Sequence, residues 1–168
     1  LLLLFYRAGW ATFLASNLLL TTLIVQPIKH IVNAPRPLTW FAEHMPDQTL
    51  PLVDGIRMNL WLSFPSGHTA TTFMGAELVR IEYGDDSPWY SVGAYTIATA
   101  VGVLRVYNNH HWFTDVFAGA GIGILSARIG YWLLPYTRKA MYRLTGCDAF
   151  VCPSVSYEGA TLGVVMRF

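Results

Sequence analysis

Charge is scarce in this chain of 168 residues. Lysine, arginine, aspartate and glutamate make up 12% of it, against about a quarter in an average soluble domain, and apolar residues make up 54%. This balance is typical of a membrane protein, or of a soluble helical protein with an unusually apolar interior. The net charge of +1 leaves no marked basic excess, so the sequence predicts no nucleic-acid partner.

Cysteine is also rare, with Cys147 and Cys152 near the C-terminus as the two in the chain. They offer too few ligands for a zinc site, and either a disulfide in an oxidising compartment or two separate thiols stays open. The chain lacks an initiator Met and a basic leader, so it looks like the inside of a longer sequence. A preceding signal peptide or helix therefore stays open.

Long apolar segments alternate with polar ones. Residues 8–28 carry no charge and are long enough to cross a bilayer once. Residues 30–63 contain four prolines and scattered charge, which predicts a loop or short surface helices. Residues 89–104 and 112–134 are again largely apolar. In the last segment, close helix approach is predicted at Gly119, Gly121 and Gly123.

The polar stretches carry helix boundaries. A helix is predicted to begin after residues 65–67 and to reach about Tyr83, although Glu77 and Arg80 make it a poor bilayer span. Glu77 is predicted to be a buried, hydrogen-bonded partner, so this face of the helix needs protein neighbours. The next helix begins with Ser87 as N-cap and proline at its first position.

Threading these segments through a bilayer gathers the polar motifs on one side. The other helix ends carry basic residues, as the positive-inside rule expects of a cytoplasmic face. We therefore expect the polar cluster to face outward, toward the periplasm if the membrane is a bacterial inner membrane. The tryptophans fit interfacial belts better than a cofactor site. The basic residues of the cytoplasmic ends are Arg7, Arg80, Arg138, Lys139 and Arg143.

Three short segments carry groups suited to phosphate chemistry: residues 29–37, 64–68 and 105–115. A phosphoryl group in transfer spreads negative charge over its oxygens, so a site for it needs fixed cations and N–H donors. The cations are available from Lys29, Arg36 and Arg105, and the planar fork of arginine suits phosphate well. The donors are available from Ser66 and Gly67, because they open a predicted helix whose first N–H groups favour an anion.

Two histidines complete the predicted chemistry. His111 lies four residues before Asp115, so that at the start of a helix the carboxylate could hold one imidazole nitrogen and direct the other outward. This predicts His111 as nucleophile and Asp115 as its orienting acid. His68, on another helix, is predicted to be the general acid that protonates the leaving oxygen. His30, His44 and His110 are interpreted as surface or packing residues.

The order and spacing of these motifs resemble the three-part signature of the type 2 phosphatidic acid phosphatase superfamily. That superfamily contains membrane lipid phosphatases, soluble bacterial acid phosphatases and vanadium haloperoxidases. The resemblance covers residues 29–134, and it implies an all-α helical bundle, a phosphohistidine at His111 and no metal or other cofactor. The residues that carry it are Lys29 with Arg36 and Pro37, Pro65 to His68, and Arg105 with His111 and Asp115.

One position departs from the family pattern. The serine that usually precedes the third-motif arginine is Leu104 here, so a phosphate contact is missing or replaced. We expect residues 1–143 to form the phosphatase domain, with an N-terminus that lacks part of the usual six-helix bundle. Residues 144–168 form a tail, irregular or strand-like at its end, to which no role is assigned.

The sequence therefore predicts a transmembrane, metal-independent phosphatase that removes a terminal phosphate from a lipid phosphate or diphosphate. One alternative keeps the fold and makes the protein a soluble periplasmic acid phosphatase or a vanadate-dependent haloperoxidase. A second is a non-catalytic membrane protein that binds lipid phosphate, or haem through His68 and His111. A third is a metal-dependent hydrolase. The identity of the lipid and the oligomeric state are not readable from the sequence.

Overall fold

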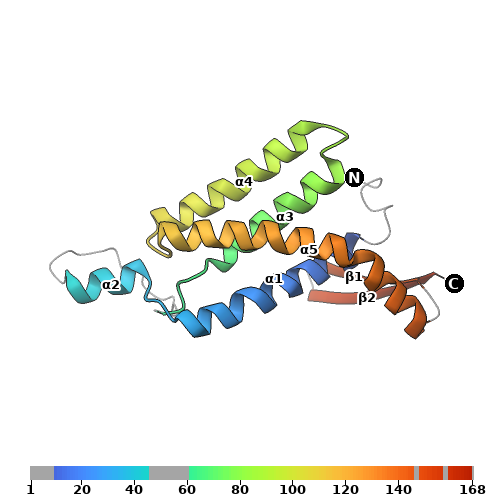
Figure 1. The fold of residues 1–168 in the computed structure, drawn as a ribbon, viewed down its shortest axis with the longest axis horizontal. Coiled ribbons are helices and arrows are strands. Elements are labelled where there is room, and N and C mark those ends of the chain that lie inside the picture. Colours follow the sequence, from blue (N-terminus) through green and yellow to red (C-terminus); the bar gives the residue numbers. More distant parts are fainter. Residues whose placement is uncertain (1–9, 46–60, 146–147, 157–158, 168) are drawn as a thin grey trace.

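A computed structural model describes residues 10–45, 61–145, 148–156 and 159–167. These residues form a bundle of long helices with a short helix at one end and a two-stranded hairpin at the C-terminus (Figure 1). The expected all-α bundle is confirmed. The helices are α1 (Trp10–Val32), α2 (Pro37–His44), α3 (Gly67–Tyr83), α4 (Pro88–Tyr107) and α5 (Phe113–Thr145).

The centre of the bundle is α3, which packs against α5 and α4, while α1 lies along α5 and α3. Figure 1 shows α2 projecting from the end of the bundle where α1 finishes and α5 begins. The described apolar core is small and consists of Met74, Leu78 and Ala127, with Leu14 and Leu134 packed against it. Much of the remaining apolar surface of α4 and α5 is exposed.

Glycines bring α5 close to α3. A Cβ atom at Gly119 would collide with the backbone oxygen of Ser66, and one at Gly123 would collide with that of Ala70. Gly121 has no atom within 4 Å of the corresponding position, so the predicted close approach holds for two of the three glycines. Because α5 approaches α3 so closely, the start of α5 lies beside the start of α3.

Glu77 is buried inside the bundle, as predicted, with an exposed fraction of 1%. Its carboxylate accepts hydrogen bonds from Nε and an Nη of Arg80 at 2.8 and 2.7 Å, and from Nε of Arg128 at 2.9 Å. The hydroxyl of Tyr95 donates a further bond. The protein neighbours expected on this face of α3 therefore come from α4 and α5, and they compensate the buried charge.

The helix boundaries follow the sequence signals, with two extensions. Ser66 and Ser87 are the N-caps of α3 and α4, and proline occupies the first turn of α4. Helix α1 passes through Pro27 and ends only at Val32, so Lys29 lies in its last turn rather than beyond it. Helix α5 likewise continues through Pro135 to Thr145.

In the described part of the chain, one helical segment, Phe113–Tyr136, is long and apolar enough to cross a bilayer by length and composition. Of the predicted span over residues 8–28, residues 10–28 form most of α1, and residues 8 and 9 lie outside the description.

The C-terminal tail forms the antiparallel strands β1 (Asp148–Ser156) and β2 (Gly159–Arg167), and β1 contacts α1 and α5. Cys147 lies outside the described residues, so the state of the two cysteines stays a prediction. The domain boundary at residue 143 also stays a prediction.

Candidate active site

Backbone and side-chain hydrogen bonds tie the three predicted motif segments together at one end of the bundle. Each segment lies at a helix end, and each is bonded to at least one of the others. These hydrogen bonds therefore hold the three motif segments near one another without a ligand. The bonds are Ser63 N to Ala34 O at 2.9 Å, Leu38 N to Asn109 O at 3.3 Å, Ser66 N to Asp115 O at 2.9 Å and Trp112 Nε1 to Pro35 O at 2.9 Å.

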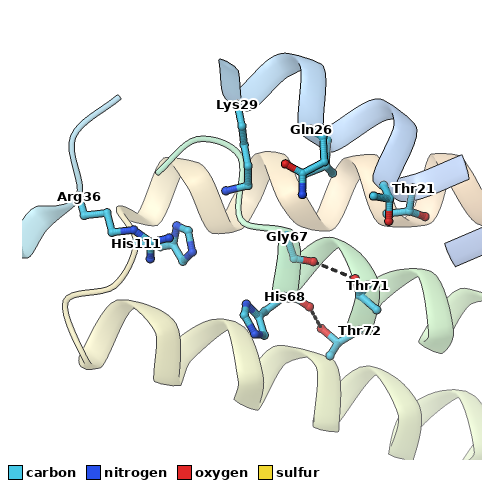
Figure 2. A pocket seen from close by; sticks show the side chains of 11 residues that line it. Thr21, Gln26, Lys29, Arg36, Gly67, His68, Thr71, Thr72 and His111 are labelled. Atoms are coloured by element: carbon cyan, nitrogen blue, oxygen red, sulfur yellow. Dashed lines mark hydrogen bonds between the residues drawn. The ribbon is translucent and has the colours of Figure 1, made fainter. Parts of the chain in front are cut away.

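A pocket of about 420 Å³ opens where these segments meet, between α1 and α3. Figure 2 shows Lys29, Arg36, His68 and His111 gathered at one end of it, with the hydroxyl groups of α3 further along. The convergence predicted from the sequence is therefore present for these four side chains and for Gly67. The full lining is Thr21, Thr22, Val25, Gln26, Lys29, Arg36, Gly67, His68, Thr71, Thr72 and His111.

Lys29 reaches the pocket from the last turn of α1 and is 9% exposed. Its Nζ donates a hydrogen bond to the backbone oxygen of Leu62 at 2.7 Å. Burial, followed by the positive charge of Arg36, lowers its pKa to about 8. Leu62 has a φ of 63°, which leucine rarely adopts, and this conformation holds a carbonyl oxygen against Lys29.

Arg36 enters from the loop between α1 and α2. One of its Nη atoms donates to the backbone oxygen of His110 at 3.1 Å, which fixes the guanidinium beside the third motif. Its Nε is buried without a hydrogen-bond partner in the described part of the chain. A buried donor of this kind is expected to be satisfied by a bound group or by water, because leaving it unpaired is unfavourable.

His111 is 3% exposed, and its ring lies beside the carboxylate of Asp115. Its Nδ1 is 3.5 Å from Oδ2 of Asp115, which leaves Nε2 on the side of the ring that faces the pocket. The same carboxylate oxygen accepts the hydroxyl of Ser63 at 2.5 Å and the backbone N–H of Trp112 at 2.9 Å. Asp115 is thus fixed in place, and it can orient the imidazole.

The environment keeps His111 neutral. Burial is the main cause of its lowered pKa, and the charges of Arg36 and Lys29 act in the same direction, against the contact with Asp115. A neutral imidazole has a lone pair on one nitrogen, which a nucleophile requires.

His68 lies in the first turn of α3, opposite His111 across the pocket (Figure 2). Its ring is exposed to the pocket, and its pKa is lowered by partial burial and then by the charges of Arg105, His111, Arg36 and Lys29. Gly67 precedes it at the first position of α3, where backbone N–H groups have no partner within the helix. This helix end can therefore donate hydrogen bonds to an anion.

Two of the predicted phosphate ligands do not line the pocket. Ser66 is fully buried, its N–H is used by the backbone of Asp115, and its hydroxyl accepts from Thr69. In this arrangement Ser66 joins α3 to α5 instead of offering a donor to an anion. Arg105 lies in the last turn of α4, close enough for its charge to lower the pKa of Arg36 and His68.

The structure also shows residues that the sequence gave no reason to select. Ser63 contacts both Asp115 and His111, the latter at 3.5 Å from Nδ1. Gln26 and four threonines line the pocket beyond the cations. A serine upstream of the proline of the second motif, and hydroxyl groups at helical spacing, are too common to stand out without the helix packing.

Two histidines and two fixed cations therefore lie together at one end of a helical bundle. The chain belongs to the PAP2 superfamily, whose family model matches residues 10–139. The resemblance seen in the sequence is therefore confirmed.

The chain is similar to two proteins whose names concern lipid phosphates. Lipid A 1-phosphatase of Porphyromonas gingivalis is 52% identical over 80 residues, which are 48% of this chain and 17% of that protein. Probable lipid phosphate phosphatase 4 of Arabidopsis thaliana is 28% identical over 142 residues, covering 67% of this chain and 44% of the relative. The chain thus spans less than half the length of either protein.

A solved structure shares the fold. LpxE of Aquifex aeolicus superposes with a TM-score of 0.58 at 29% identity, over 78% of this chain and 72% of that one.

Proposed function

We propose that the protein is a metal-independent phosphatase that removes phosphate from a lipid phosphate or diphosphate through a phosphohistidine at His111. One observation carries this proposal. A buried imidazole backed by a carboxylate lines the same pocket as two cations and a helix N-terminus. The names of the relatives, which concern lipid A and lipid phosphates, support a lipid substrate.

In the first step, Nε2 of His111 attacks phosphorus as the bond from phosphorus to the leaving oxygen breaks. Lys29, Arg36 and the N–H group of Gly67 hold the non-bridging oxygens, where negative charge is concentrated in the transition state. Asp115 stabilises the imidazole as it becomes positively charged. Arg105 adds positive potential without lining the pocket.

The leaving oxygen needs a proton, and His68 is the group placed to give it. In the empty pocket its pKa is lowered, so it is mostly neutral at pH 7. A bound dianionic phosphate compensates the positive charges that lower this pKa, so substrate binding favours the protonated form. In the second step, neutral His68 activates a water that attacks phosphorus, and the phosphorus–nitrogen bond to His111 breaks.

We propose a membrane setting, with the site near one interface. Tyr107, Phe113 and Phe117 are exposed near the site. Trp89 and Tyr90 are exposed at the far end of α4, and Trp132 is exposed part-way along α5. Tyr107 and Trp89 are eighteen residues apart on α4, which corresponds to about 27 Å at about 1.5 Å per residue, close to the hydrocarbon thickness of about 30 Å. By the positive-inside rule the site would face the periplasm of a bacterial inner membrane.

The test is phosphate release by the purified protein from four lipids with EDTA present: phosphatidic acid, phosphatidylglycerol phosphate, a polyprenyl diphosphate and lipid A. His111→Ala is expected to abolish turnover and leave thermal unfolding almost unchanged. Wild type with ³²P-labelled substrate is expected to give acid-labile label on the protein. Turnover by His111→Ala would remove this residue from the mechanism, and loss of activity with EDTA would favour a metal hydrolase.

A general acid can be tested through the leaving group. His68→Asn is expected to lower the rate of phosphoenzyme formation, measured in a single turnover, by about 10²- to 10⁴-fold for a lipid phosphate and much less for p-nitrophenyl phosphate, because nitrophenolate leaves without a proton. Equal losses on both substrates would contradict this role. Halide oxidation in the presence of vanadate, or a haem absorption band, would favour the alternatives of the same fold or of a binding protein.

A further inference from the structure

Ser63, in the stretch before α3, is bonded to both of the other motif segments. Its backbone N–H donates to the backbone oxygen of Ala34, in the first motif, at 2.9 Å. Its hydroxyl donates to Oδ2 of Asp115, in the third motif, at 2.5 Å. The side chain is fully buried and does not line the pocket. Ser63 can therefore act on a bound phosphate only through the residues that it contacts.

The backbone of the same stretch holds a pocket cation. The carbonyl oxygen of Leu62 accepts from Nζ of Lys29 at 2.7 Å, and the positive φ of Leu62 turns this oxygen toward the ammonium group. The next residue, Ser63, directs its hydroxyl to Asp115. The cation is thus held by a backbone atom, whereas the carboxylate is held by a side chain. A substitution of Ser63 can remove the second connection and keep the first.

The hydroxyl of Ser63 also bears on which nitrogen of His111 carries a proton. Its oxygen is 3.5 Å from Nδ1 of His111, the same distance as Oδ2 of Asp115. A hydroxyl has one hydrogen, and this one is donated to Asp115, so toward Nδ1 the oxygen can only accept. Both oxygens beside Nδ1 are then acceptors, which places the proton of the neutral ring on Nδ1 and the lone pair on Nε2.

We infer that Ser63 is a positioning residue that holds Asp115 and His111 in the arrangement in which Nε2 attacks phosphorus. This inference rests on the proposed function. Without the hydroxyl, Oδ2 of Asp115 keeps the N–H of Trp112 as its fixed donor, so the carboxylate is freer to rotate. The imidazole also loses one of the two acceptors that favour a proton on Nδ1. Small displacements of a reacting group lower the rate strongly, because the attack depends on alignment.

The experiment measures phosphoenzyme formation from one lipid phosphate in a single turnover. Ser63→Ala is expected to lower the maximal rate by about 10- to 100-fold and to change the half-saturating substrate concentration less than about twofold. The second value is expected to stay because the bond from Lys29 to the backbone of Leu62 remains. Ser63→Thr restores a hydroxyl and is expected to recover most of the lost rate.

Ser126→Ala is the matched control. Ser126 is also fully buried, but it lies in α5 outside the pocket, and its hydroxyl donates to the backbone oxygen of Ile122 at 2.6 Å. This variant removes the same atom from an equally buried position, and it is expected to leave the rate per folded molecule unchanged. Equal losses of rate in the two alanine variants would show that Ser63 acts through folding alone, and would overturn the inference.

The inference and the proposed function fail on different results. An unchanged rate in Ser63→Ala, or a Ser63→Thr variant of wild-type thermal stability that is as slow as Ser63→Ala, would overturn the inference while the phosphatase itself stands. If wild type forms no phosphoenzyme, the proposed function fails. Nitrogen NMR of ¹⁵N-histidine-labelled protein then decides about Ser63. Wild type and Ser126→Ala are expected to show His111 with its proton on Nδ1, and Ser63→Ala an additional Nε2–H population; identical His111 signals in all three would overturn the inference.

Discussion

Lys29 is expected to set the alkaline limit of activity. Its pKa of about 8, against an ordinary value of 10.5, reflects the removal of its ammonium group from water and the proximity of Arg36. At about 1.4 kcal/mol per pH unit, this difference corresponds to about 3 kcal/mol in favour of the neutral amine. The charge needed to hold a phosphate oxygen is therefore present at pH 7 and lost over the next two pH units.

The same residue has opposite effects on activity and on stability. Above pH 8 the folded protein has released a proton that the unfolded chain still binds, up to about pH 10.5. Stability rises with pH wherever the unfolded state binds more protons, so Lys29 adds up to about 3 kcal/mol to the free energy of unfolding across this window. Catalysis by the free enzyme should instead decline about tenfold per pH unit above pH 8, because the protonated fraction declines in that proportion.

The assay is kcat/KM between pH 6 and pH 10 for wild type, Lys29→Arg and Lys29→Met with one soluble phosphate monoester. We expect the decline above pH 8 in wild type, its absence in Lys29→Arg, and low, nearly pH-independent activity in Lys29→Met. Thermal unfolding over the same range checks that the variants fold. A wild-type profile that stays level to pH 9.5, or a Lys29→Arg profile that still declines at pH 8, would refute the reasoning.

Three further predictions concern packing and positioning. Asp115→Asn should lower kcat by about 10²- to 10⁴-fold in steady-state kinetics with little change in KM, because the imidazole loses the anion that orients it; a KM effect alone would contradict this. Gly123→Ala should lower the free energy of unfolding by about 1–3 kcal/mol, since its Cβ meets the backbone of Ala70, whereas Gly121→Ala should change it by less than about 0.5 kcal/mol. Glu77→Gln should lower it by about 1–3 kcal/mol without changing kcat per folded molecule, because the buried carboxylate loses its charge-assisted hydrogen bonds while the arginines left behind, Arg80 and Arg128, are 41% and 62% exposed. Denaturant unfolding in detergent measures both stability effects, and equal values for the two glycine variants would argue against the helix packing described above.

Helix starts were predictable from the sequence where a few neighbouring residues determine the backbone conformation. Both helix starts were predictable: the side chain of Ser66 caps α3 by accepting from the N–H of Thr69, whereas at α4 Ser87 makes no side-chain cap bond and proline at the first helical position marks the start. The extension of α1 to Val32 and of α5 to Thr145 was not predictable. Apolar runs end where polar residues begin, whereas helices continue as long as the backbone geometry allows.

The candidate site also contains residues that were predictable from the sequence and residues that were not. Lys29, Arg36, His68 and His111 could be selected because their order and spacing resemble a family signature, and they line one pocket. Ser66 was selected as a donor because it opens a predicted helix, yet its N–H is bonded to the backbone oxygen of Asp115, a contact that depends on the approach of α5 to α3. Gln26 belongs to no motif. Its place in the pocket depends on the rotation of α1 against α3, which the sequence does not specify.

The electrostatics of the pocket favour a doubly charged phosphoryl group. The positive groups disfavour one another when the site is empty, since Arg36 lowers the pKa of Lys29, and Arg105 lowers those of Arg36 and His68. The nearby carboxylate of Asp115 raises the pKa of Lys29 and of Arg36, but its single negative charge does not offset several positive ones. A dianion relieves this repulsion about twice as much as a monoanion does, because Coulomb energies scale with charge. Phosphate monoesters should therefore bind in preference to diesters, which keep one negative charge and place an additional carbon group among the cations.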